Sequence, residues 1–138
     1  MLRTLFALIS GLFAMMIVTT IVALASAKYL YATPAGFDVA DVAQLRAFVA
    51  AMPVAVLALL VSSWCVAAFV GGGVAARLSS WHPLACAVAI GTVVTAAQVP
   101  NALAIGYPAW AVVAGMALPM PLAWLAASLV QKGLASTR

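Results

Sequence analysis

Four long stretches without a charged residue decide what this chain can fold into. They cover residues 4–27, 53–76, 84–105 and 109–130. Each has about 22–24 residues, which makes an α-helix about 33–36 Å long, and the hydrocarbon core of a bilayer is about 30 Å thick. Because lipid offers backbone groups no hydrogen bonds, each stretch is expected to be helical. The sequence therefore predicts an all-α membrane protein, a bundle of four transmembrane helices.

The composition agrees with a lipid environment. The chain is 68% hydrophobic and 6% charged, whereas soluble domains carry about 25% charged residues. Its 138 residues allow one domain, a single transmembrane domain over 1–138. The six basic residues are scattered, so nucleic-acid binding, which needs basic residues clustered on one face, is not expected. The predicted partner is the lipid bilayer, and the candidates for a protein partner are another membrane protein or further copies of this chain.

The first stretch also has the features of a signal peptide. Arg3 precedes the apolar run, and the run ends in Ala25-Ser26-Ala27, a small-residue pattern like that of a cleavage site. The apolar core of a signal peptide has about 7–15 residues, and this run is longer. Its length favours a membrane helix that is not cleaved.

The basic residues predict the orientation. Four spans place the N-terminus, the loop at 77–83 and the C-terminus on one side. The basic residues there are Arg3, Arg77, Lys132 and Arg138. The other side holds Lys28 and Arg46. By the positive-inside rule, both termini are predicted to be cytoplasmic.

Asp38 and Asp41 are the only two acidic residues of the chain. Asp38 is predicted as the N-cap of a short outer helix over 38–52, with Asp41 at N3 as a variant of the capping box. Phe37 and Val42 match the hydrophobic staple that often accompanies it. A calcium site is the alternative, but Ca²⁺ needs six or more oxygen ligands and the chain has no further carboxylates.

Other residues argue against catalysis and metal binding. His82 is the only histidine, and it lacks ligands at zinc-site spacing. Cys65 and Cys86 are predicted at heights about 15 Å apart and so to be free thiols. No Asp, Glu, Lys or Arg lies inside a predicted span, although such residues usually mark proton relays and ion pathways. We expect a protein that is not an enzyme and needs no metal or cofactor.

Small residues recur every four positions in the second span. One row is Ser63, Ala67, Gly71 and Ala75, and a parallel row contains Gly72. Such rows let another helix backbone come close. They predict tight helix packing, either inside the monomer or against a second copy.

Polar residues of all four spans fall at one predicted level, slightly outside the midplane. They are Thr19, Thr20, Ser62, Ser63, Thr95 and Gln98, with Asn101 just above. Pro119 deprives the Gly115 carbonyl of its helical donor. These groups could simply bond between helices. The sharper hypothesis is an outward-facing polar pocket lined by Gln98 and Asn101 and completed by the Gly115 carbonyl.

Several glycine, proline and aromatic positions follow a recognisable order: "PAGFD..D...L", then "FVGGGVAA", then a Pro-x-Trp near the last hairpin. The matching residues are Pro34, Gly36, Asp38, Asp41, Pro53, the glycines at 71–73, Asn101, Pro108 and Trp110. This order, over roughly residues 30–127, resembles that of small bacterial four-span membrane proteins, although Tyr107 stands where such proteins are expected to have His. The resemblance implies the fold and a bacterial inner membrane but no reaction.

Two classes of function remain open. The first is a non-enzymatic membrane module that acts through helix packing, as a subunit, an assembly factor or a homo-oligomer. The second is a small transporter, channel or lipid-binding bundle that uses the polar pocket. A continuous polar path through the bundle would favour the second class, and the sequence offers a polar layer without a path of charges.

Overall fold

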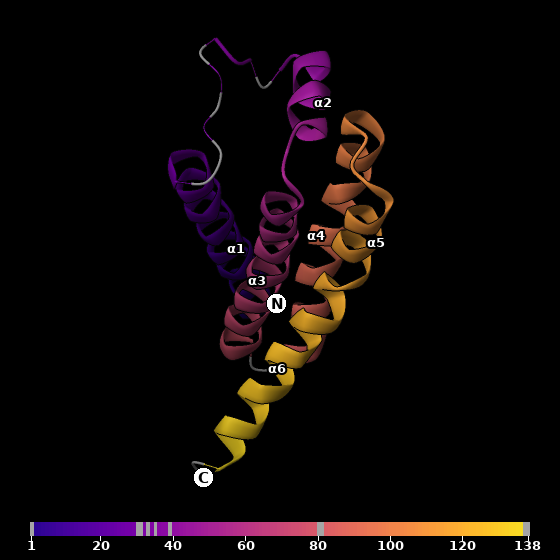
Figure 1. The fold of residues 1–138 in the computed structure, drawn as a ribbon. Coiled ribbons are helices and arrows are strands. Elements are labelled where there is room, and N and C mark those ends of the chain that lie inside the picture. Colours follow the sequence, from indigo (N-terminus) through magenta and orange to yellow (C-terminus); the bar gives the residue numbers. More distant parts are fainter. Residues whose placement is uncertain are drawn as a thin grey trace.

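A computed structural model of the chain describes residues 2–29, 32, 34, 36–38, 40–79 and 82–136, without the side chains at 27, 29 and 136. All regular secondary structure in that part of the chain is α-helical (Figure 1). The helices are α1 (Leu2–Tyr29), α2 (Val42–Ala50), α3 (Val54–Leu78), α4 (Pro83–Ile105), α5 (Ala109–Ala117) and α6 (Pro119–Ser136). The predicted all-α fold class is confirmed, including the short helix between the first two spans. Arg138, which entered the prediction of orientation, lies outside the described residues.

Four helical segments are long and apolar enough to cross a bilayer. They are Leu2–Ser26, Val54–Leu78, Pro83–Ile105 and Ala109–Ala135. The fourth combines α5 and α6. It extends beyond the predicted end near residue 130, because the helix continues through Gln131 and Lys132 after the apolar run has stopped.

The third helix, α3, occupies the centre of the bundle. It packs against α1, α4 and α6, whereas α1 has its main contact with α3 and a smaller one with α4. Figure 1 shows α1 leaning away from α3 towards the end of the bundle that carries α2. We call that end the loop end. The opposite end, with the start of α1, the α3–α4 connection and the last turns of α6, is called the terminal end.

The contact between α1 and α3 depends on two glycines that face each other. A Cβ atom added to Gly11 would lie 2.7 Å from the carbonyl oxygen of Gly71, and one added to Gly71 would lie 2.8 Å from the carbonyl oxygen of Gly11. Neither position has room for a side chain, so the two backbones are in direct contact. This row of small residues on α3 is therefore used inside the monomer.

The parallel row on α3 packs against α6 in the same way. A Cβ atom on Gly72 would lie 2.9 Å from the Cβ atom of Ala123. Farther towards the terminal end, Ala76 of α3 is buried with Ala87 of α4 and Ala127 of α6. Both predicted rows thus make contacts within one chain.

The short helix α2 begins later than the sequence analysis predicted. Its N-cap is Asp41, whose Oδ1 accepts hydrogen bonds from the backbone N–H groups of Ala43 at 2.9 Å and Gln44 at 3.3 Å. The predicted start at Asp38 is therefore wrong by about one turn. Gln44 at N3 donates its side-chain amide to Asp41 Oδ2 at 3.0 Å, whereas the N–H of Asp41 donates to the carbonyl of Asp38 at 3.2 Å, so Asp41 and Gln44 have the spacing of a capping box without its reciprocal bond.

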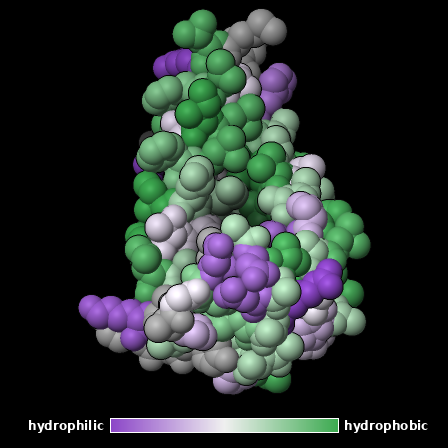
Figure 2. All heavy atoms as spheres, turned by 90° about the horizontal axis from the view of Figure 1, so that it is seen from above, coloured by the Kyte–Doolittle hydropathy of each residue, from purple (hydrophilic) through white to green (hydrophobic). Residues whose placement is uncertain are grey.

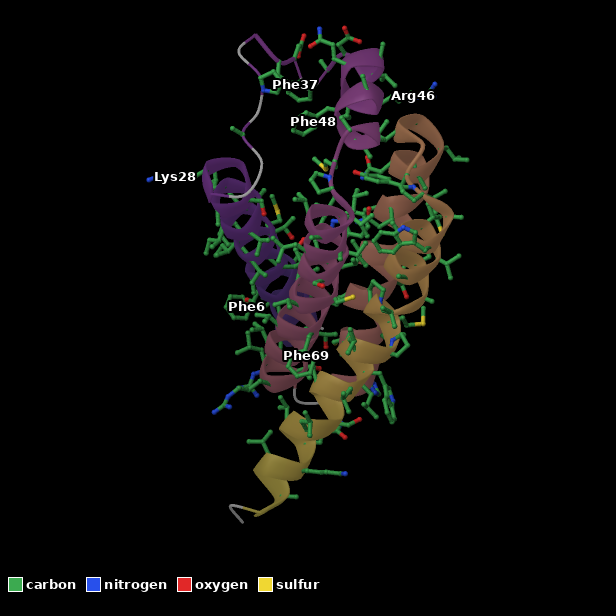
Figure 3. The ribbon with its side chains drawn as sticks, in the orientation of Figure 1. Phe6, Lys28, Phe37, Arg46, Phe48 and Phe69 are labelled. Atoms are coloured by element: carbon green, nitrogen blue, oxygen red, sulfur yellow. The ribbon has the colours of Figure 1, made fainter. Side chains whose placement is uncertain are left out.

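Asp38 stabilises the turn before the helix. Its Oδ1 accepts from the N–H of Ala40 at 2.9 Å, and its own N–H donates to Gln44 Oε1 at 3.3 Å. Phe37 packs on Phe48, with ring centroids 4.8 Å apart (Figure 3). Val42 is the first residue of α2 and so is not at the N4 position that the predicted staple requires. Both carboxylates nevertheless bind backbone N–H groups, as local capping chemistry requires.

Side chains of α2 fix it to the loop end of the bundle. Arg46 Nε donates a hydrogen bond to the carbonyl of Ala104 in the last turn of α4. That carbonyl has no donor within its own helix, and a cation near a helix C-terminus is favourable. Val49 is buried with Leu57 and Ile105, so the attachment is also apolar.

The fourth span is broken where its prolines predict a break. α5 ends at Ala117 and α6 begins at Pro119, with Leu118 between them. Proline lacks the N–H that would continue the ladder and clashes with the preceding turn. In contrast, α4 continues through Pro100 without interruption.

Candidate functional site

Hydroxyl groups in the predicted polar layer bond mostly to their own helices. Thr19 donates to the carbonyl of Met15 at 2.9 Å, Ser62 to that of Ala58 at 2.8 Å, and Ser63 to that of Leu60 at 2.6 Å. This back-bonding satisfies each hydroxyl without a partner from another helix. These three residues therefore do not join the four spans through a shared network.

Thr95 behaves differently, because its hydroxyl donates across the bundle. Thr95 Oγ1 lies 3.3 Å from the carbonyl oxygen of Met116, close to the break between α5 and α6. A break in a helix leaves carbonyl groups without their usual donors. Thr95 thus links α4 to the fourth span next to the break between α5 and α6.

Gln98 and Asn101 do not combine into a polar wall. Asn101 is exposed, and its Nδ2 donates to the carbonyl of Ala97 in its own helix at 3.2 Å. Gln98 is half-buried, and its Oε1 is buried without a hydrogen-bond partner among the described residues. An unsatisfied buried acceptor costs about 1–3 kcal/mol.

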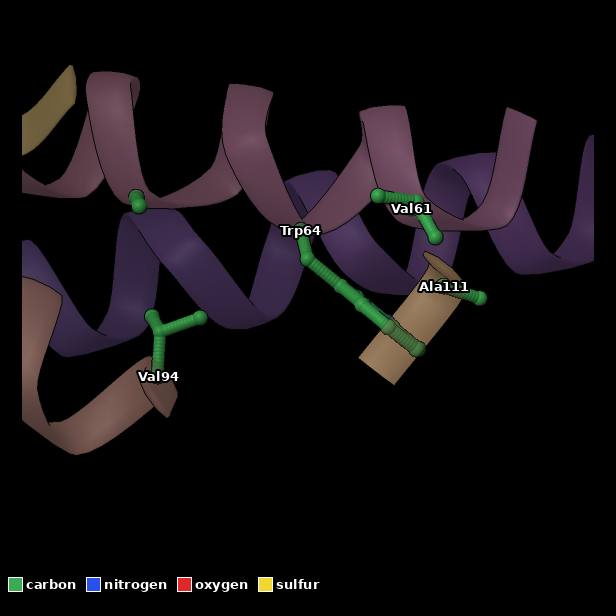
Figure 4. Close-up of a cluster of buried hydrophobic side chains, with 5 residues drawn as sticks. Val61, Trp64, Val94 and Ala111 are labelled. Carbon is green, nitrogen blue, oxygen red and sulfur yellow. The ribbon is translucent and has the colours of Figure 1, made fainter. Parts of the chain in front are cut away.

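The space beside Gly115 is filled by a side chain. A Cβ atom on Gly115 would lie 2.7 Å from Cζ3 of Trp64, so the indole ring rests directly on the α5 backbone. Trp64 is buried with Val61, Val94 and Ala111 in the interior between α3, α4 and α5 (Figure 4). The glycine admits the tryptophan, and no room for a ligand remains at this place.

Tyr107 closes the same cluster at the loop end. Its ring meets Trp64 edge-on, with centroids 5.8 Å apart and an interplanar angle of 82°, a favourable geometry for two aromatic rings. Tyr107 lies in the connection between α4 and α5, and burial raises the pKa of its phenol. The phenol is therefore neutral at physiological pH.

The predicted pocket residues are consequently not assembled into one site. Thr20, Ser62 and Asn101 are exposed on α1, α3 and α4, while Gly115 is covered by Trp64. Two of the predicted residues still fit the hypothesis in part. Thr95 donates a hydrogen bond to another helix, and Gln98 has a buried oxygen without a partner among the described residues. Nothing in the sequence indicated that Trp64 would occupy the space beside Gly115. The two residues are far apart in the sequence, and only the packing of α5 on α3 brings them together.

Three hollows on the surface are lined by other residues. The largest, about 640 Å³, runs between α3 and α6 near the terminal end. A second, about 370 Å³, lies between Phe37 and the side of α2. A third, about 300 Å³, follows the outer face of α1 around Phe13 and Thr20. Gln98 and Asn101 line none of these three.

The loop end carries a group of polar side chains. Figure 2 looks onto this end and shows hydrophilic residues gathered near its middle, with hydrophobic residues around them. The exposed side chains of α2 include Gln44 and Arg46. A polar cap above apolar flanks is the arrangement expected where helices leave a bilayer.

In the described part of the chain, no group of three His, Cys, Asp or Glu side chains is placed to hold a metal ion. Cys65 and Cys86 are free thiols. Cys86 Sγ donates to Ser79 Oγ at 3.4 Å, a contact that stabilises the turn between α3 and α4.

Comparisons with family models, with curated proteins and with solved structures gave no match. The resemblance to small bacterial four-span proteins therefore stays a prediction. The chain itself shows an all-α protein with four long apolar helices packed as a bundle, suited by length and composition to cross a membrane.

Proposed function

We propose that this chain is a non-catalytic integral membrane module that works through lateral helix contacts, as a subunit, an assembly factor or a homo-oligomer. The observation that carries the proposal is the outward face of α1. Only 11% of the most apolar window of this span is buried, against 39% for α3. Large side chains cover that face, including Phe6, Phe13 and Leu24, which are 63–67% exposed.

The exposed face of α1 has the spacing of a helix-pairing surface. Phe6, Ile9, Phe13, Met16 and Thr20 alternate by three and four residues. This is the spacing that a left-handed pair of helices uses. The row could therefore seat one further helix along most of the bilayer.

Thr20 gives this face a polar group that has no partner among the described residues. Its hydroxyl makes no hydrogen bond within the described residues, whereas the neighbouring Thr19 bonds back to Met15. A hydroxyl that faces lipid gains from a donor or acceptor on another helix, and such contacts contribute about 0.6 kcal/mol on average. A partner helix on this face would satisfy Thr20.

Cross-linking tests the proposal directly. We would introduce single cysteines in a background that lacks Cys65 and Cys86, placing one at Phe13→Cys and a matched one at Val113→Cys. Both native residues are apolar and about equally exposed, at 66% and 65%. We expect cross-links, to a second copy or to another protein, from position 13 and none from position 113. Equal yields at the two positions would contradict a contact face on α1.

We also propose that the chain lies in a bacterial inner membrane with both termini in the cytoplasm. The same cysteine-free background tests this orientation. Ala40→Cys lies at the loop end and Lys132→Cys at the terminal end, and both native residues are exposed. A reagent that cannot cross the membrane should label position 40 in intact cells and leave position 132 unlabelled. The reverse pattern would invert the topology.

A transporter, channel or lipid-binding bundle is the second candidate. The observation that favours it is the Oε1 of Gln98, which is buried without a hydrogen-bond partner in the described part of the chain. In an open path this oxygen would bind water or a passing solute. Gln98→Cys should then react with a water-soluble thiol reagent, while an exposed control such as Leu103→Cys, facing lipid, should not. Failure of position 98 to react would leave the packing module as the better proposal.

A further inference from the structure

The groove between α3 and α6 combines an apolar floor with one cation at its end. Phe69, Val70 and Gly73 line it from α3, and Ala126 and Val130 from α6. Arg77 stands at the terminal end of the same groove. Figure 3 shows Phe69 on the part of α3 beside α6.

The groove exists because glycines leave space between the two helices. A Cβ atom on Gly73 would meet nothing closer than Ala126 Cβ at 3.6 Å, and one on Gly133 would meet nothing within 4 Å. Nearer the middle of the bundle, Gly72 is in direct contact with Ala123. The helices therefore touch at Gly72 and leave a hollow of about 640 Å³ farther along.

Arg77 is a charge without a partner in the part of the chain that the structure describes. It is exposed and forms no hydrogen bond or ion pair among the described residues. The chain's two acidic side chains, Asp38 and Asp41, belong to the turn and helix at the loop end. A guanidinium at the membrane surface that pairs with no acidic side chain among the described residues is suited to bind a phosphate group.

The length of the groove matches one leaflet. Phe69 and Arg77 are eight residues apart, which is about 12 Å along a helix, and half of a bilayer core is about 15 Å. The groove therefore complements one phospholipid, because its cation lies where the phosphate would be and its apolar part lies where an acyl chain would be. Basic pockets between spanning helices on the cytoplasmic side bind anionic head groups.

We propose that the α3–α6 groove binds one anionic phospholipid of the leaflet at the terminal end, with an acyl chain along Gly73 and the phosphate on Arg77. The groove does not involve α1, so this proposal does not depend on the function proposed above. A helix from another protein is the competing occupant, and the experiment below separates the two.

The test uses the full-length chain in mild detergent, equilibrated with equal amounts of phosphatidylglycerol and phosphatidylcholine that carry the same acyl chains. Native mass spectrometry counts the lipids retained. We expect wild type to retain phosphatidylglycerol preferentially and Arg77→Gln to lower that preference about fivefold. Arg3→Gln is the matched control, because it removes the same charge from α1, which does not contact α6 among the described residues.

A second variant tests the apolar part of the site. Gly73→Leu fills the groove where there is room for a side chain, so the fold should persist, and retention of both lipids should fall. The proposal is overturned if Arg77→Gln and Arg3→Gln have equal effects, or if Gly73→Leu retains as much lipid as wild type. A change in oligomeric state in Gly73→Leu, with lipid retention unchanged, would assign the groove to a protein helix.

Discussion

The spans α1 and α3 are similarly long and apolar, yet they occupy opposite positions in the bundle. α3 is at the centre, in contact with the other three spans, while α1 is attached along one side. The difference follows the size of their side chains. α3 presents Ser63, Ala67 and Gly71 to its neighbours, whereas α1 carries Phe6 and Phe13 outwards. In lipid, where apolar character does not distinguish inside from outside, close approach of backbones decides which helix is central.

Truncating one aromatic residue in each helix should give the largest contrast. Trp64→Ala removes a side chain that is 9% exposed and packs against Gly115, and we expect a loss of about 3 kcal/mol of stability. Phe13→Ala removes a side chain that is 66% exposed and should change the stability of the monomer little. Unfolding in mixed micelles measures both. Equal losses would mean that α1 is not peripheral.

Adding the same side chain at two glycines of α3 should sharpen the comparison. Gly71→Leu forces a side chain into the Gly11 backbone and should cost about 3 kcal/mol. Gly73→Leu, two positions away, points at the groove and should be nearly neutral. Thermal unfolding of the two variants gives the difference. Wild-type stability of Gly71→Leu would show that α1 can leave α3 at no cost.

The connection between these two helices depends on the cap of α2. Asp41→Ala removes an acceptor for two backbone N–H groups and should destabilise α2 by about 1 kcal/mol. Asp38→Ala removes a bond to one N–H group in the preceding turn and should cost less. Hydrogen exchange over residues 42–50 reports the local stability. A larger effect at Asp38 would restore the cap position that the sequence analysis favoured.

The smallest effect concerns the hydroxyl that bonds between helices. Thr95→Val removes the contact with Met116 and should cost about 0.6 kcal/mol. Thr92→Val is the matched control, because Thr92 bonds to Val88 in its own helix. Denaturation of the two variants under one condition measures the difference. Identical stabilities would show that Thr95 does not strengthen the break in the fourth span.

The candidate site could be predicted only in part. Proline at 119 lacks the N–H that would continue the helix, so an interruption of the fourth span could be expected from the sequence, although Pro100 leaves α4 unbroken. The use of each hydroxyl was not, because serine and threonine can bond either to their own helix or to another. The environment of Gln98 was also hidden, since the burial of its Oε1 depends on how the helices pack.

The number and helical nature of the spans were determined by the sequence alone, because a long uncharged stretch in lipid has no other way to satisfy its backbone. The presence of small-residue rows and of capping carboxylates was determined in the same way, by local chemistry. Tertiary structure decided which row of α3 meets α1 and which meets α6, since both rows satisfy the same spacing rule. It also decided that Gly73 lines a groove while Gly71 and Gly72 lie in contacts, because the distance between two crossing helices changes along their length.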